Sequence, residues 1–372
     1  MKFLKLPIFV QLLMILACVM LFGDLLPRSL QEVLYSISLT LKGLLLFITP
    51  IIIFLCLLSS VSSLRGKAAI SFILIILSIV CLSNYVATMI AYAVASLNLV
   101  NIDISSISTE GDNELSPLWN IAFPELLPNN YALLLGLGFG FILFFLPYSL
   151  SYQLSTKARY LVSLFFDKFF IPLLPLFILG FIFKMQVEDT LVDSLRFCVP
   201  LMLLIVLTYI LYVTLLFAIV AKFNFDLWWQ YIKNTLPAAI LGFSTMSSLI
   251  AMPLTMNAAT QNTGSQDLSR LIIPLTVNIH TIGLAINIPL IALSILSNFG
   301  FSLPVFTTYS EFAFYFVLTQ FGIAAAPGCG ILLMLPLLEK YLGFTDNMSA
   351  LITAMSFFTV EFSELSKWSS AI

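Results

Sequence analysis

The chain has 372 residues, of which 60% are hydrophobic and only 9% are charged, and its formal net charge is −2. Soluble domains carry about 25% charged residues, so this chain has too few charges to cover a surface in water. The composition predicts an all-α polytopic membrane protein. A nucleic-acid-binding protein is excluded, because the sequence has no basic run and no basic patch with interleaved aromatic residues.

Eight continuous apolar stretches are long enough to cross a bilayer, for which a helix needs about 20 mostly apolar residues. None alternates between polar and apolar residues, so transmembrane β-strands are not expected. The first stretch superficially resembles a signal peptide, but no small-residue cleavage site follows it, and we expect it to be retained. The predicted spans lie near residues 5–24, 34–60, 68–97, 131–150, 159–184, 195–221, 271–297 and 348–368.

The five cysteines all lie in apolar segments, and none belongs to a Cys-x-x-Cys pair. Their number is odd, and free cysteine is among the most buried residue types. The sequence therefore predicts buried thiols, with no disulfide and no metal site.

The distribution of lysine and arginine predicts the orientation, because cytoplasmic loops carry an excess of both residues. With the N-terminus inside, ten of these residues lie in cytoplasmic loops and four lie in external loops. Both termini are then cytoplasmic, and the short loops favour the cytoplasmic (inner) membrane of a bacterium. The longest polar loop, residues 98–130, is acidic and external, and we expect a surface loop there.

Two further apolar segments, near residues 235–260 and 312–338, are interrupted at their centres. The first contains Pro253 beside a serine cluster, and the second contains Pro-Gly-Cys-Gly at residues 327–330. Irregular backbone inside a bilayer must be buried in protein or line a cavity, because lipid cannot satisfy its N–H and C=O groups. Paired segments of this kind are typical of transporter binding sites. The sequence therefore predicts two re-entrant helical hairpins and a protein that moves a small solute.

The span between these segments carries polar residues at its centre, namely Asn278, His280 and Thr281. His280 is the only histidine in the chain, and its ordinary pKa of about 6.5 suits proton exchange near physiological pH. Two interpretations of His280 are open: it couples protons or contacts the solute, or it is hydrogen-bonded to backbone in a packed helix. Asn278 offers an amide and a carbonyl at a turn that we expect to be unwound.

Two other groups of residues each allow two interpretations. Ser247 and Ser248 expose polar groups at the first hairpin tip, where half-helix N-termini favour an anionic group, or they simply ease helix packing. Glu361 and Glu364 share one helix face with Lys367. Ionisable groups within a membrane indicate function, but these three also suit the cytoplasmic exit of the last helix.

A proline inside an apolar motif occurs at residues 47–54 and again at residues 170–177, three spans later. Spans three apart have opposite orientations, so the recurrence fits an inverted repeat. The alternative is that prolines are common in membrane helices, and the sequence leaves both open.

The order of these elements resembles the dicarboxylate/amino acid:cation symporter family, the glutamate transporter homologues, over nearly the whole chain. Ser247 and Ser248 resemble the serine-rich tip of the family's first hairpin. Thr-Val-Asn-Ile-His at residues 276–280 resembles the Thr-x-Asn-Met-Asp motif of its seventh span, and residues 322–330 resemble the tip of its second hairpin. Asn-Tyr-Val-Ala-Thr at residues 84–88 also fits the family's third span.

The resemblance implies a homotrimer whose subunits have eight transmembrane helices and two re-entrant hairpins in an inverted-repeat fold. Residues 1–222 would form six spans, of which spans 1, 2, 4 and 5 are a static scaffold and spans 3 and 6 join the transport domain. Residues 223–372 would form the transport core, which moves like an elevator. The implied cation-coupling residues are Thr88, Asn278 and His280. The implied solute-binding residues are Ser247, Ser248, Asn278, Thr281, Ala326, Gly328, Glu361 and Glu364.

The chain departs from the family where the family binds ions and acidic side chains. His280 stands in place of a sodium-binding aspartate, and no Asp-x-x-Arg or Asn-x-x-x-Asp pattern fits the last span, residues 351–372. Sodium prefers oxygen ligands, which an imidazole does not supply, and an acidic side chain loses its bidentate arginine partner. We therefore expect weak or absent sodium coupling and no strong preference for acidic amino acids.

The favoured function is a secondary active transporter (symporter) of a small organic solute, an amino acid or a carboxylate. The coupling ion, sodium or a proton, is left open, and no cofactor or nucleic-acid partner is expected. The alternatives are a degenerate family member that acts as an uncoupled facilitator and a non-transporting membrane subunit. An enzyme is disfavoured, because one histidine cannot supply a metal cluster and no HExxH or Walker motif is present.

Overall fold

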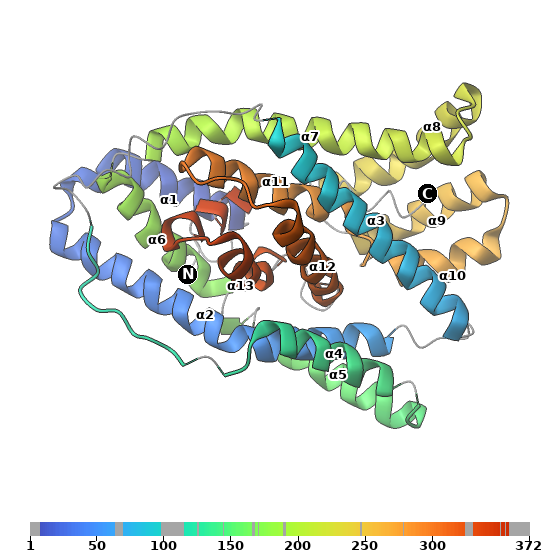
Figure 1. The fold of residues 1–372 in the computed structure, drawn as a ribbon, viewed down its shortest axis with the longest axis horizontal. Coiled ribbons are helices and arrows are strands. Elements are labelled where there is room, and N and C mark those ends of the chain that lie inside the picture. Colours follow the sequence, from blue (N-terminus) through green and yellow to red (C-terminus); the bar gives the residue numbers. More distant parts are fainter. Residues whose placement is uncertain are drawn as a thin grey trace.

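The computed structural model of the chain describes residues 8–63, 70–97, 115–124, 126–143, 145–165, 168–169, 171–188, 191–245, 248–277, 279–323, 330–349, 351–353 and 355–356. Within these ranges all regular secondary structure is helical (Figure 1). The elements are α1 (Ile8–Phe22), η2 (Gly23–Leu25), α2 (Arg28–Ser63), α3 (Ile70–Ser96), α4 (Asn129–Ile142), α5 (Tyr148–Phe165), α6 (Ile171–Val187), α7 (Leu191–Val220), α8 (Phe225–Thr245), α9 (Ser248–Thr263), α10 (Gln266–Thr276), α11 (Ile282–Asn298), α12 (Phe306–Ile323) and α13 (Gly330–Leu342).

Helices α2, α3 and α7 are each long and apolar enough to cross a membrane. Helices α4, α6 and α11 are also apolar but shorter, at 14, 17 and 17 residues. A helix satisfies its backbone hydrogen bonds within itself, which is the condition for crossing lipid. Together with the composition, these helices make the chain an integral membrane protein.

Helix α2 is the centre of one group of helices. Helices α4, α5 and α6 pack against it, and α1 packs against α6. Gly180 allows α6 to approach α2 closely, because a Cβ at this position would overlap the backbone oxygen of Leu34. Small residues at such contacts are typical of helix packing in membranes. The segment 115–124 also runs along α2 (Figure 1), where the N–H of Leu118 donates to Ser36 Oγ at 2.8 Å.

A second group of helices forms around α11. This helix packs against α3 and α7, α7 continues into contact with α8, and α8 to α10 follow one another at one end of the molecule (Figure 1). Nearly every residue of α11 is buried. Helix α12 packs against both α2 and α3, so it lies between the two groups.

Each interrupted segment forms two helices packed side by side, α8 with α9 and α12 with α13. In the first pair, α8 ends at Thr245 and α9 begins at Ser248, whereas Pro253 lies inside α9. The chain is therefore helical at Pro253, because a helix can continue through a proline with the loss of one backbone hydrogen bond. The re-entrant placement of both pairs in the membrane stays a prediction.

The structure corrects the predicted spans 131–150 and 159–184. Helix α4 ends at Ile142, and α5 is a separate helix that begins at Tyr148. The backbone oxygen of Pro147 accepts from the N–H groups of the next helical turn, so this proline starts a helix, as its fixed φ favours. The second predicted span covers the end of α5 and most of α6. Cys18 is exposed, so the expectation that every thiol is buried is wrong for this residue.

A buried lysine joins α2 to α13 and to the residues that follow α13. Lys42 of α2 is 4% exposed, and its Nζ lies 2.7 Å from Glu339 Oε1 on α13 and 2.6 Å from Asp346 Oδ1. Ser349 Oγ also donates to Glu339 Oε1, at 3.2 Å. Ionisable groups within membrane helices pair in this way because an isolated charge there is costly. The ion pairs fix the end of the second helical pair on α2.

Candidate functional site

The predicted seventh span is broken at its centre. Helix α10 ends at Thr276 and α11 begins at Ile282, with turn or irregular backbone at Val277 and at residues 279–281. The N–H groups of Ile279 and His280 both donate to the backbone oxygen of Thr276, at 2.9 and 2.8 Å. The predicted unwound turn is therefore present in the described residues.

Helix α3 supports this break through two adjacent polar side chains. Asn84 is fully buried, and its Nδ2 donates to the backbone oxygen of Ile279 at 3.0 Å. Ser83 Oγ lies 3.0 Å from Nε2 of His280, which is half-buried. A backbone oxygen in a broken helix has no intrahelical partner, so Asn84 replaces a hydrogen bond that the break removes.

Thr88 lies one helical turn beyond Asn84 and connects the site to α12. Its backbone oxygen accepts a hydrogen bond from the hydroxyl of Tyr309 at 2.8 Å, and its own hydroxyl donates to the backbone oxygen of Asn84 at 2.9 Å. Both Thr88 and Tyr309 are fully buried. Helix α3 thus carries a row of polar groups that contact the break and the first helix of the second pair.

Two oxygens at this crossing have no hydrogen-bond partner in the described part of the structure. They are Asn84 Oδ1 and Thr281 Oγ1, and both residues are buried. Thr281 occupies the N-cap position of α11, but its side chain does not cap the helix. Buried polar atoms are almost always hydrogen-bonded, so these oxygens are available to a cation or to a donor on a solute.

The imidazole of His280 has a defined partner in the hydroxyl of Ser83. Tyr212 of α7 donates its hydroxyl to the backbone oxygen of Ser83 at 3.3 Å, which holds α7 against the same turn of α3. The contact with Ser83 fits the second interpretation of His280, a histidine that is hydrogen-bonded within a packed helix. The partner is the side chain of Ser83, however, and not a backbone group as that interpretation expected. The imidazole supplies nitrogen and not the anionic oxygen that sodium prefers.

The structure places only some of the residues predicted for the site. Thr88, His280 and Thr281 are described, and all three lie on α3 or at the break that α3 supports. Ser248 is the first residue of α9, and its side chain is not described. The remaining predictions lie outside the described residues: Ser247, Asn278, Ala326, Gly328, Glu361 and Glu364.

Sequence reasoning missed three polar side chains around the crossing. Ser83, Tyr212 and Tyr309 contact His280, Ser83 and Thr88, respectively. Ser83 precedes the 84–88 motif directly, so its position beside that motif was the one available signal. The two tyrosines lie in long apolar helices, where a hydroxyl partner is visible only in three dimensions.

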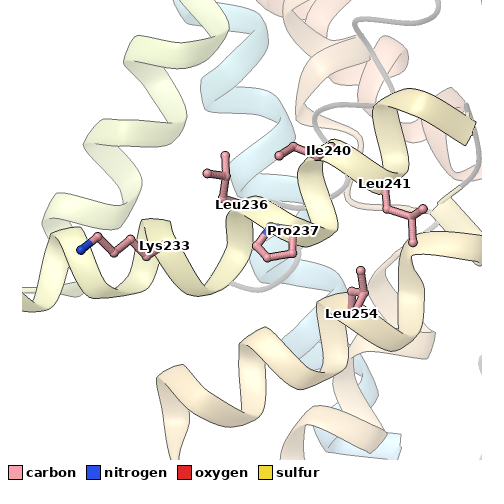
Figure 2. A pocket seen from close by; sticks show the side chains of 6 residues that line it. All are labelled: Lys233, Leu236, Pro237, Ile240, Leu241 and Leu254. Atoms are coloured by element: carbon pink, nitrogen blue, oxygen red, sulfur yellow. The ribbon is translucent and has the colours of Figure 1, made fainter.

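An open groove of about 510 Å³ runs along the first helical pair (Figure 2). Its side chains come from α8 and α9, and none of the predicted solute-binding residues is among them. Five of the six lining side chains are apolar and offer a polar solute no hydrogen bond. We therefore do not assign the solute site to this groove. The lining residues are Lys233, Leu236, Pro237, Ile240, Leu241 and Leu254.

Buried polar groups at a helix break, flanked by two interrupted helical pairs within a membrane protein, are typical of solute transporters. The chain matches the model of the Sodium:dicarboxylate symporter family over residues 8–362, and it belongs to this family. The resemblance that the motifs indicated is thereby confirmed. The family comprises transporters and not enzymes, which also confirms the prediction that the chain is not an enzyme. None of the curated proteins matches the chain at a significant level.

Proposed function

We propose that the protein is a secondary active transporter that carries a small organic solute, an amino acid or a carboxylate. The solute would bind where α3 crosses the break between α10 and α11. The observation that carries the proposal is the pair of buried oxygens, Asn84 Oδ1 and Thr281 Oγ1, that have no partner among the described residues. Burying such a polar group within a membrane costs free energy unless a ligand forms a hydrogen bond with it or coordinates to it.

The movement that we propose is of the elevator type, within a homotrimer. The packing of α11 on α3 and α7 supports the assignment of spans 3 and 6 to a transport domain with residues 223–372. The packing of α4, α5 and α6 on α2 supports a scaffold drawn from the rest of residues 1–222. Helix α12 contacts α2 and would lie at the boundary between the two domains. We place both termini in the cytoplasm and the protein in a bacterial inner membrane.

The family is sodium-coupled, but we propose that this chain does not couple sodium through the aspartate position of the seventh span. His280 occupies that position, and its ring contacts Ser83 at 3.0 Å. The mechanisms that remain are proton coupling, sodium coupling through oxygen ligands elsewhere and uncoupled facilitation. The loss of the aspartate is the observation that favours the facilitator as a second candidate function.

The test is uptake by the purified protein in liposomes, with labelled amino acids and small carboxylates offered under a sodium gradient, a proton gradient or neither. Proton-driven uptake that His280→Ala abolishes supports proton coupling at His280. Uptake without any gradient, limited to equilibration, supports the facilitator. Strong sodium-driven uptake of aspartate or glutamate contradicts the proposal for the coupling ion.

A further inference from the structure

The groove along the first helical pair carries a positive charge at one end and apolar side chains over the rest of its length (Figure 2). Five of its lining residues belong to α8, from Lys233 to Leu241, and their spacing places them on one face of that helix. Leu254 lines the groove from α9, and its side chain points toward α8 (Figure 2). Eight residues of helix rise by about 12 Å, so the groove presents a cation followed by an apolar stripe of that length.

An aromatic residue places the Lys233 end of the groove near the surface of the membrane. Trp229 is exposed and precedes Lys233 by one helical turn, and Lys233 Nζ lies 5.3 Å from the centre of its ring. Tryptophan is enriched where the hydrocarbon of a membrane meets the lipid headgroups. From Leu236 to Phe243 the chain is apolar and uncharged. The groove therefore runs from the level of the headgroups at Lys233 into the hydrocarbon.

The charge of Lys233 is not neutralised by a carboxylate in the described part of the structure. The ion pairs found there use Arg28, Lys42 and Lys184 as cations. Lys233 is exposed instead, and its ammonium lies against the Trp229 ring. Lysine binds phosphate as a point charge, and lysines beside a membrane are attracted to the anionic lipids of the cytoplasmic leaflet. Lys233 is cytoplasmic in the predicted orientation, so this end of the groove is complementary to an anionic headgroup.

A phospholipid presents the same two features in the same order, a charged phosphate at the interface and then an acyl chain. A helix of another protein fits the groove less well, because a transmembrane helix is about 30 Å long, more than twice the length of the stripe. A free phosphate ion would use Lys233 and leave the apolar side chains without a partner. The groove's volume of about 510 Å³ lies within the range of roughly 300–1,000 Å³ that is usual for small-molecule sites.

We propose that this groove binds one phospholipid with an anionic headgroup, whose phosphate pairs with the Lys233 ammonium and whose acyl chain lies along the apolar stripe. The chain contacts α8 between Leu236 and Leu241, and it contacts α9 at Leu254. Because one ligand touches both helices, it stabilises their packing against each other. The inference does not depend on which solute the protein carries, because no residue predicted for solute binding lines the groove.

The test measures lipid binding by the purified full-length protein in detergent, through native mass spectrometry and the melting temperature. The probes are phosphatidylglycerol, phosphatidylcholine with the same acyl chains, and glycerol 3-phosphate, an anionic head without an acyl chain. Wild-type protein is expected to retain one phosphatidylglycerol per chain in preference to phosphatidylcholine, and to melt at a higher temperature with it. Glycerol 3-phosphate is expected to have no effect. Lys233→Gln should lower the affinity for phosphatidylglycerol about fivefold and leave that for phosphatidylcholine unchanged.

Three further variants separate the charge from the groove. Lys157→Gln is the matched control for charge, because Lys157 is an exposed lysine of α5 on the same predicted side of the membrane, and it should leave the lipid preference unchanged. Leu254→Trp fills the groove and should weaken the binding of both lipids. Ile250→Trp is its control, because Ile250 is exposed on α9 but does not line the groove, and it should leave lipid binding unchanged.

An unchanged preference for phosphatidylglycerol in folded Lys233→Gln overturns the inference. An equal effect of glycerol 3-phosphate also overturns it, because the site would then take a free anion, and so does unchanged lipid binding in Leu254→Trp. If Lys233→Gln does not fold, Leu254→Trp tests the inference in its place. A wild-type protein that retains neither lipid contradicts the inference as well, and a changed oligomeric state in Leu254→Trp would then assign the groove to a contact between subunits.

Discussion

Replacing Lys42 with methionine tests whether the ion pairs stabilise the contact between α2 and the second helical pair. The Lys42 side chain is 6% exposed, whereas those of Glu339 and Asp346 are 26% and 56% exposed. Removing one partner of a fully buried pair costs about 3–5 kcal/mol, and an exposed pair contributes about 0.2–1 kcal/mol. The variant leaves two partly exposed carboxylates without their cation, so we expect a loss of about 2 kcal/mol. Asp346→Asn should cost less than Glu339→Gln, because Asp346 is the more exposed.

The assay is equilibrium unfolding in detergent, with Lys340→Met as the matched control. Lys340 lies on the same helix as Glu339 but is exposed, so its substitution should change the stability by less than about 0.5 kcal/mol. The variant Lys42→Met/Glu339→Gln should be less destabilised than the sum of the two single variants, because the two residues interact directly. Equal effects of Lys42→Met and Lys340→Met would refute the reasoning.

Two further substitutions test the packing. Gly180→Ala should destabilise the protein by about 1–3 kcal/mol, because the new Cβ would overlap the backbone oxygen of Leu34; a melting temperature equal to wild type would contradict the close approach of α2 and α6. Gly138→Ala is its control, since nothing lies within 4 Å of a Cβ there, and it should leave the melting temperature unchanged or raise it through the better helix propensity of alanine. Tyr309→Phe should cost about 1 kcal/mol in unfolding free energy, because it removes the hydrogen bond to Thr88; no change in stability would show that this bond does not hold α12 on α3.

The interruptions in the chain were predictable, because polar and Pro/Gly residues inside apolar stretches leave a strong local signal. The break between α10 and α11 and the helical pairs α8/α9 and α12/α13 follow the predicted order. The span 131–150 was wrong because hydropathy alone does not separate two helices that meet at a proline, and the span 159–184 was wrong because it joined the end of α5 to α6. Pro147 begins a helix whose sequence is much more polar than that of α4.

The long-range contacts were not predictable, because they join residues whose spacing carries no pattern. Lys42 and Asp346 are 304 residues apart, and Lys42 offered no indication of its partners. Gln320 is one polar residue in an apolar helix, and its burial without a partner among the described residues was not predictable from its place in the sequence. The roles of all the residues predicted for the site stay predictions, and six of these residues also lie outside the described part of the chain: Ser247, Asn278, Ala326, Gly328, Glu361 and Glu364.

The measurement that tests the central claim most directly is solute counterflow in liposomes. Vesicles containing the purified protein are loaded with an unlabelled neutral amino acid and diluted into a trace of the labelled form, without any ion gradient. A carrier predicts transient accumulation of label above its external concentration, whichever ion it couples. The absence of counterflow for every amino acid and carboxylate tested, with protein shown to be folded, would contradict the assignment of this chain as a solute carrier.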